Sequence, residues 1–131
     1  MRLLLDTQVF LWIATDSPRL PRELRSTLRE PSNDLYLSVV SSWEIAVKAR
    51  SGKLVLPMPV WAFLLESRER LGIQTLSIQE PAVAHVAKLP NIHRDPFDRM
   101  LVCQAIEHQL TIVTSDAQLQ RYPVKTLWAV N

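Results

Sequence analysis

The sequence predicts an α/β fold in which a parallel β-sheet is covered by helices on both faces. Short apolar runs of strand length recur along the chain, and segments with helical spacing of apolar residues lie between them. Strands that alternate with helices in this way form parallel sheets, which bury both of their faces. The chain has 131 residues and contains no internal repeat, low-complexity tract or long linker. Residues 1–131 are therefore predicted to form one domain.

The first half of the chain is predicted to contain both strands and helices, each with a recognisable start or end. The run Leu3-Leu4-Leu5 has no polar break and predicts a buried strand. Pro21 suits the first turn of a helix, and Gly72 suits a helix end. In chain order, the predicted elements are a strand at 2–5, helices at 7–13 and 21–29, a strand at 35–38, and helices at 41–50 and 59–71.

The second half continues the alternation. Residues 73–78 alternate between apolar and polar side chains, which predicts a strand. Residues 96–108 are apolar on most of the helix surface, as expected for a helix that packs on a sheet and is covered by its neighbours. The predicted elements are a strand at 73–78, a helix at 80–88, a loop at 90–94, a helix at 96–108, a strand at 110–114, a short helix at 116–121 and a strand at 124–128.

The composition excludes several classes of protein. Only 2 glycines against 9 prolines argue against a glycine-rich phosphate-binding loop, and a net charge of +2 is compatible with a polyanionic partner without requiring one. Cys103 is the only cysteine, so no internal disulfide forms, and its apolar neighbours predict a core residue rather than a catalytic thiol. Asp6 interrupts the N-terminal apolar run too early for a signal peptide, and no run approaches the ~20 residues of a membrane span. We expect a soluble cytoplasmic protein.

Four carboxylates are the most informative side chains, because each follows an apolar run or opens a helix. They are Asp6, Glu44, Asp98 and Asp116. Ligands of open parallel sheets bind outside the carboxyl ends of the strands, so acids at that edge would meet in one cleft. Clustered carboxylates repel one another, and a hard divalent cation relieves that repulsion by binding their oxygens. The placement indicates metal-dependent chemistry on phosphates.

Each acid also has a purely structural interpretation as a helix cap. Asp6 and Asp116 can each cap the helix that follows, and Ser41 with Glu44 fits a capping box. Asp95 fits a second cap, with Pro96 at the first helical position and Asp98 three residues after the cap. Taken singly, capping is the simpler interpretation. The joint placement at two strand ends and two helix starts favours a metal cleft.

The remaining polar and aromatic residues carry weaker signals. Lys48 lies one helical turn after Glu44, and Arg94 and Arg99 flank the Asp95 turn; these cations either contact nucleic-acid phosphates or balance the local acids. No spacing of the histidines is typical of zinc ligation, so no role is predicted for His93 or His108. The tryptophans are predicted to be core or interface residues; they are Trp12, Trp43, Trp61 and Trp128.

Together these segments resemble one known family, the PIN-domain ribonucleases, and within it the VapC-type toxins of bacterial and archaeal toxin–antitoxin pairs. The resemblance runs nearly end to end and rests on four segments in the expected order. The segments are Leu4-Leu5-Asp6-Thr7, Ser42-Trp43-Glu44-Ile45-Ala46, His93-Arg94-Asp95-Pro96-Phe97-Asp98-Arg99 and Val113-Thr114-Ser115-Asp116. One departure is Gln8, where members of this subgroup often carry histidine.

The resemblance implies a three-layer α/β/α sandwich around a parallel sheet of four or five strands. It also implies Mg²⁺- or Mn²⁺-dependent endonucleolytic cleavage of RNA. The implied metal ligands are Asp6 and Asp116 directly, with Glu44 and Asp98 completing the shell, binding through water or forming a second site. Thr114 is expected to orient Asp116 or a water of the metal, and Asp95 is not expected to bind the metal directly.

The resemblance further implies a small VapB-like antitoxin whose C-terminal segment lies along the toxin. Apolar residues in the helix at 7–13 and at 60–65 predict a homodimer, because one small domain is not expected to bury them fully. Two alternatives stay open. One is a non-catalytic PIN-like module that binds RNA or protein, which Gln8 favours. The other is a phosphotransfer protein with Asp6 as the phosphorylated residue, although Gln8 stands where a dehalogenase-type phosphatase would have a second Asp.

Overall fold

The computed structural model describes residues 1–128 and contains a five-stranded sheet in which every strand pair is parallel. The strand order is β3-β2-β1-β4-β5, so β1 lies at the centre. The strands are β1 (Arg2–Leu5), β2 (Asp34–Ser38), β3 (Ile73–Leu76), β4 (Thr111–Thr114) and β5 (Thr126–Trp128). The α/β class and the parallel sheet are confirmed.

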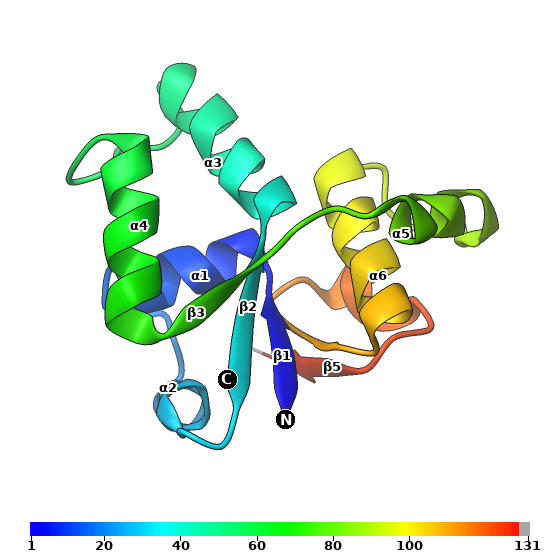
Figure 1. Ribbon diagram of the computed structural model, residues 1–131, viewed down its shortest axis with the longest axis horizontal. Coiled ribbons are helices and arrows are strands. Elements are labelled where there is room, and N and C mark those ends of the chain that lie inside the picture. Colours follow the sequence, from blue (N-terminus) through cyan, green and yellow to red (C-terminus); the bar gives the residue numbers. More distant parts are fainter. Residues whose placement is uncertain (129–131) are drawn as a thin grey trace.

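Helices cover both faces of this sheet. The α-helices are α1 (Thr7–Ala14), α2 (Arg22–Arg29), α3 (Val39–Arg50), α4 (Val60–Leu71), α5 (Glu80–Ala84) and α6 (Pro96–His108). Two short 3₁₀-helices, η1 (His85–Lys88) and η2 (Ala117–Arg121), complete the described elements. In Figure 1, α1, α2 and α4 lie on one side of the strands and α5 and α6 on the other, while α3 rises from the carboxyl end of β2. The expected three-layer sandwich is therefore confirmed.

The central strand β1 divides the core into two halves. Side chains alternate between the two faces of a strand. Leu3 and Leu5 accordingly pack in one cluster with Phe10 of α1 and Phe63 of α4, whereas Leu4 packs in the other with residues of α6. All three leucines are fully buried, so their packing fixes the position of β1 in the core. The position of Asp6, the next residue, is fixed with it.

The start of α3 differs from the prediction. The helix begins at Val39 rather than at residue 41, and the side chain of Ser38 caps it by accepting a hydrogen bond of 3.0 Å from the Val40 N–H. The capping box of Ser41 and Glu44 is therefore wrong. The last residue of β2 supplies the cap, so the chain passes from strand to helix without a loop. Ser41 and Glu44 lie inside the helix, and both are buried.

The core interpretation of the tryptophans needs correction, whereas the core position of Cys103 is confirmed by its complete burial. Trp43 and Trp61 are 61% and 70% exposed, so the core interpretation is wrong for them, and the interface interpretation stays a prediction. The helix at 7–13 buries Phe10 in the core, whereas Leu11 and Trp12 stay partly exposed, so its contribution to a homodimer stays a prediction. No helix among the described residues is long and apolar enough to cross a membrane.

The strand order places a switch point at the carboxyl ends of β1 and β4. From β1 the chain builds outward through β2 and β3, and it then returns to β4 on the other side of β1. The connections after β1 and β4 therefore diverge, and ligands of open α/β sheets bind in the crevice at this switch point. Asp6 directly follows β1, and Asp116 lies two residues beyond the end of β4. The fold thus delivers two of the predicted acids to the expected edge.

Two helix ends depend on left-handed backbone. Gly72 ends α4 with φ of 65°, in the left-handed region that favours glycine, and an added Cβ would meet no atom within 4 Å. Backbone strain alone therefore decides the outcome, and Gly72→Ala should lower the free energy of unfolding by about 1 kcal/mol in chemical denaturation. The matched control is Gln109→Gly at the end of α6, where φ is 55°, and it should change stability in the opposite sense. A stabilising Gly72→Ala would contradict this account.

Candidate metal centre

A cleft of about 470 Å³ opens at the switch point of the sheet. All four predicted acids line it, although they come from separate parts of the chain. The lining residues are Asp6, Thr7, Gln8, Leu11, Glu44, Lys48, Asp95, Asp98, Ser115, Asp116 and Ala117. Two acids follow the central strands, one projects from α3 and one from the first turn of α6. The structure therefore brings together the acids selected from the sequence, and it places Asp95 beside them.

Asp6 serves both as a helix cap and as part of the cleft. Its Oδ1 accepts a hydrogen bond of 2.8 Å from the Val9 N–H, which caps α1. Its Oδ2 accepts a hydrogen bond from the hydroxyl of Thr114 at the end of β4. The residue is only 5% exposed. The cap that was its structural alternative is thus part of what holds the carboxylate at the cleft.

Thr114 joins the two strand ends. Its hydroxyl oxygen donates to Asp6 and accepts a hydrogen bond of 3.0 Å from the backbone N–H of Asp116. Thr114 therefore does not contact the Asp116 carboxylate as expected, but bonds to the Asp6 carboxylate and to the Asp116 backbone. Thr114 therefore orients the Asp6 carboxylate and fixes the turn that leads to Asp116.

Glu44 is held on both of its carboxylate oxygens. Oε1 accepts a hydrogen bond of 2.6 Å from the hydroxyl of Thr7, which also lies 2.9 Å from the Ser41 hydroxyl. Oε2 pairs with Lys48 Nζ at 2.6 Å, as expected for residues one helical turn apart. The Glu44 side chain is 7% exposed, against 46% for Lys48. The cation thus reaches from the rim of the cleft to a buried acid.

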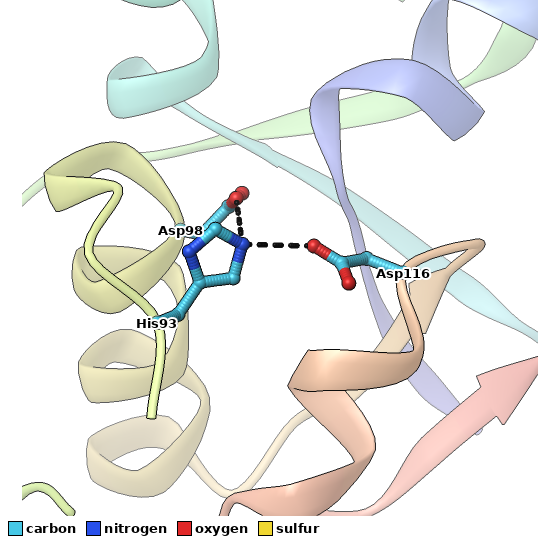
Figure 2. A group of neighbouring side chains, drawn as sticks. All are labelled: His93, Asp98 and Asp116. Atoms are coloured by element: carbon cyan, nitrogen blue, oxygen red, sulfur yellow. Dashed lines mark hydrogen bonds and ion pairs between the residues drawn. The ribbon is translucent and has the colours of Figure 1, made fainter. Parts of the chain in front are cut away.

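The remaining two acids meet at a histidine. His93 Nε2 lies 2.9 Å from Asp116 Oδ2 and 3.2 Å from Asp98 Oδ2. Figure 2 shows the imidazole between the two carboxylates, with Asp98 on α6 and Asp116 on the loop after β4. One atom from each of the three residues lies within 4.8 Å of the others, close enough to share a metal ion. The second oxygen of Asp116 accepts a hydrogen bond of 2.9 Å from the Gln118 N–H and so caps η2.

Sequence reasoning missed His93, because spacing along the chain reveals histidine ligands only where they follow a zinc pattern. The contact of His93 with Asp116 joins residues 23 positions apart and depends on how α6 packs against β4. The one signal in the sequence is its position in the loop that leads directly into the helix carrying Asp98. His108, also without a predicted role, lies at the far end of the same helix.

The turn before α6 is held by two neighbouring residues. Asp95 caps the helix as predicted, because its Oδ1 accepts a hydrogen bond of 2.8 Å from the Phe97 N–H. Arg99 Nη1 lies 3.2 Å from the Pro90 carbonyl and 3.3 Å from the His93 carbonyl, to which it donates. Arg99 therefore anchors the loop that carries His93, whereas Arg94 is exposed.

Comparisons with known proteins agree with this geometry. The family model described as PIN domain matches residues 3–125. The chain belongs to the PIN-domain family. It is 30% identical over 131 residues to ribonuclease VapC22 of Mycobacterium tuberculosis, an alignment that covers 96% of this chain and 98% of the relative. A second relative, ribonuclease VapC16 of the same organism, is 35% identical over 63 residues, which are 48% of this chain and 45% of the relative. The protein is thus a VapC-type PIN domain.

Solved structures share the fold of this PIN domain. VapBC2 from Rickettsia felis, bound to a DNA fragment from its promoter, matches with a TM-score of 0.74 and 15% identity over 97% of this chain and 98% of that chain. FitAcB from Neisseria gonorrhoeae matches with a TM-score of 0.62 and 23% identity over 95% of this chain and 96% of that chain. The likeness over almost the whole length confirms the PIN-like architecture.

Burial and mutual repulsion shape the charge of Asp6. Removal from water raises its pKa to about 6, and the charge of Asp116 adds to the rise. Hydrogen bonds from Thr114, Val9 and Ser115 act in the opposite direction, because they stabilise the ionised form. The Asp6 carboxylate of this PIN domain therefore becomes protonated at a higher pH than an exposed aspartate does.

Asp98 carries the larger shift. Burial is the main cause, and the neighbouring charges of Asp95, Glu44 and Asp6 add to it, so that the pKa of Asp98 rises to about 7. The neighbouring imidazole of His93 acts in the opposite direction. These acids therefore lie close enough to repel one another, which is the condition that a bound cation relieves.

The donor set of this PIN domain fits a hard divalent cation. Five of the lining side chains are carboxylates, whereas Lys48 is the one cation among the described residues that line the cleft. Its ammonium is already paired with Glu44, which is the main reason that its pKa is raised. Carboxylate oxygens in excess of nearby cations are the ligands that Mg²⁺ and Mn²⁺ take in proteins. The cleft thus offers both the ligands and the uncompensated negative charge that such an ion requires.

The shifted pKa of Asp98 predicts that this acid weakens the metal-free fold. Above pH 7 the folded protein must hold an ionised Asp98 that the unfolded chain ionises at its ordinary pKa of 3.8. Asp98→Asn should therefore raise the free energy of unfolding at pH 8, in the presence of EDTA, by roughly 1–3 kcal/mol. The gain should shrink as the pH falls from 7 and vanish below the unfolded pKa, where both states of the wild type are protonated.

The control for this measurement is Glu69→Gln, which removes an exposed acid on α4 away from the cleft and should change stability by less than ~0.5 kcal/mol. Chemical denaturation of the three proteins at pH 8 and pH 5 checks the sign. If Asp98→Asn lowers the free energy of unfolding equally at the two pH values, ionisation of Asp98 does not destabilise the folded protein and the prediction is wrong.

Proposed function

We propose that this PIN domain is a Mg²⁺- or Mn²⁺-dependent endoribonuclease that acts in the cytoplasm as the toxin of a toxin–antitoxin pair. The observation that carries the proposal is the convergence of Asp6, Glu44, Asp98 and Asp116 on one cleft at the switch point of the sheet. The whole-length relationship to a protein named as a VapC ribonuclease supports the choice of RNA as substrate.

In this proposal Asp6 and Asp116 hold the first cation directly. Asp6 follows β1 and Asp116 follows β4, and Thr114 joins these two strand ends by hydrogen bonds with the Asp6 carboxylate and the Asp116 N–H. Glu44 and Asp98 complete the shell, bind through water or form a second site. When bound, Mg²⁺ or Mn²⁺ supplies a Lewis acid that activates water and offsets the charge of the phosphate. The reaction then needs no serine or cysteine nucleophile.

The basic residues around the cleft are proposed to hold the RNA backbone. Lys48 lies on the rim, and Arg94 is exposed beside the turn that leads to Asp98. Arg99 anchors the loop through Nη1, and its remaining guanidinium nitrogens are proposed to reach a phosphate. Contacts of this kind position a strand without reading its sequence.

The proposed partner is a small VapB-like antitoxin that covers the cleft. An arginine from such a partner would pair with two carboxylates through its planar fork and compete with the metal or with phosphate. Support for a partner comes from the fold shared with VapBC2 from Rickettsia felis and FitAcB from Neisseria gonorrhoeae. A homodimer is proposed through the apolar residues of α1 and α4, among which Trp61 and Leu65 of α4 are exposed.

One alternative function is kept, because Gln8 lines the cleft at a position where the resembling subgroup often has histidine. In that case the chain is a PIN-like module that binds RNA or protein without cutting. The alternative retains the fold and the acids, so only an activity measurement with and without metal separates it from the nuclease.

Substitution of one proposed ligand tests the nuclease directly. Asp6→Asn keeps the size of the side chain and an oxygen to cap α1, but it removes a charge from the metal shell. RNA cleavage in Mg²⁺ or Mn²⁺ should fall by on the order of 100-fold or more, equivalent to about 2.7 kcal/mol. Glu69→Gln is the control and should cleave like the wild type. Equal cleavage by Asp6→Asn and the wild type would reject Asp6 as a ligand, and wild type that binds RNA without cutting it would favour the binding module.

The partner is tested in cells. Expression of the chain alone should arrest growth, and co-expression with the small reading frame next to its gene should restore growth and give a complex in a pull-down. The Asp6→Asn protein should leave growth unaffected while still binding the neighbouring product. A chain that is harmless alone and binds no neighbour-encoded protein would remove the toxin assignment.

A further inference from the structure

We infer that His93 is a positioning residue of the proposed metal centre, which orients Asp116 through its Nε2–H group, with Asp98 in close contact, without binding the metal itself. The inference rests on the proposed function for its purpose, but its geometry is a property of the metal-free chain. The contacts of the two ring nitrogens and the anchoring of the surrounding loop carry it.

The hydrogen atom of the imidazole is assigned by the contact on its other nitrogen. Nδ1 of His93 accepts a hydrogen bond of 3.1 Å from the backbone N–H of Asp95. A nitrogen that accepts a hydrogen bond carries no hydrogen, so in this arrangement the ring hydrogen lies on Nε2. The imidazolium form would place an N–H against the Asp95 N–H. The backbone of the turn thus selects the Nε2–H tautomer.

The Nε2–H group faces two acids of the cleft. It lies 2.9 Å from Asp116 Oδ2, which accepts its hydrogen bond, and 3.2 Å from Asp98 Oδ2. Ligation of a metal through Nε2 requires the lone pair that this tautomer lacks. Binding in that way would require the other tautomer and would break the hydrogen bond with Asp95. His93 is therefore built as a donor to Asp116, with Asp98 in close contact with the same nitrogen.

The ring is held in this place by its own backbone. The His93 N–H donates to the Tyr122 hydroxyl at 2.7 Å, and the His93 carbonyl accepts from Arg99 Nη1 at 3.3 Å. Tyr122 is 3% exposed and belongs to the core cluster under α6. The loop of His93 is consequently tied to the core on one side and to α6 on the other.

This arrangement gives Asp116 a defined orientation. Its Oδ1 accepts from the Gln118 N–H and its Oδ2 from His93, so each oxygen keeps a second lone-pair direction for a cation. The Asp116 side chain is 35% exposed, so it is free to rotate toward water if the histidine is removed. Thr114 likewise orients Asp6, at the end of the neighbouring strand, by donating a hydrogen bond to its Oδ2. Partners of this kind commonly contribute 10–100-fold to metal affinity.

Two substitutions separate donation from ligation. His93→Gln places an amide N–H near the position of Nε2 and should bind Mn²⁺ within about threefold of the wild type in an electron paramagnetic resonance titration. His93→Leu has no donor and should bind Mn²⁺ roughly 10–100-fold more weakly. Spin-echo spectra of wild-type protein with Mn²⁺ should show no directly coordinated imidazole nitrogen. A coordinated nitrogen that is lost in His93→Gln, or unchanged affinity in His93→Leu, would overturn the inference.

A second measurement needs neither metal nor RNA. Nitrogen-15 spectra of histidine-labelled, metal-free wild type should show His93 as the Nε2–H tautomer, with the signal assigned by its loss in His93→Gln. The Nδ1–H tautomer would overturn the inference even if His93→Leu failed to fold. RNA cleavage by the wild type that is independent of metal would instead contradict the proposed function, and the tautomer result would remain readable.

Discussion

Carboxylate repulsion in a partly buried cleft is the constraint on which the rest of this structure depends. Five acids line one cleft, and burial together with neighbouring charge raises the pKa of Asp98 to about 7. Each of the four acids proposed as ligands makes hydrogen bonds or close polar contacts with protein groups, among them Thr114 and His93. These groups orient the oxygens but leave most of the negative charge in place. The metal-free fold thus contains an electrostatic cost that a divalent cation would relieve.

The fold tolerates this cost because two of the acids lie just beyond buried strands of the core. β1 is central and fully buried on both faces, and Asp6 follows it directly. β4 lies next to β1, so the loop that carries Asp116 emerges beside Asp6. The helices α3 and α6 then bring Glu44 and Asp98 from the two sides. Apolar packing on both faces of the sheet therefore fixes a polar site that would not assemble by itself.

Local chemistry explains which features were predictable from the sequence. The helix at 96–108 was predicted with its observed bounds, because Asp95 and Pro96 mark its start and apolar spacing marks its length. The start of α3 was missed, because Ser38 and Ser41 are equally good caps and a direct passage from strand to helix at Ser38 has no separate signal in the sequence. His93 was missed because its contact with Asp116 exists only after α6 and β4 pack together. Exposure of Trp43 likewise depends on which neighbours the topology supplies.

The central claim is that the cleft between the ends of β1 and β4 is a divalent metal centre. Anomalous X-ray diffraction from a crystal of the protein grown with Mn²⁺ tests it most directly, because it locates the ion without reference to activity. The account predicts an anomalous peak in the cleft, with carboxylate oxygens of Asp6 and Asp116 at metal–ligand distances of about 2.1–2.2 Å. A cleft without such a peak at a saturating concentration of Mn²⁺, or a peak bound only by residues outside the cleft, would contradict it.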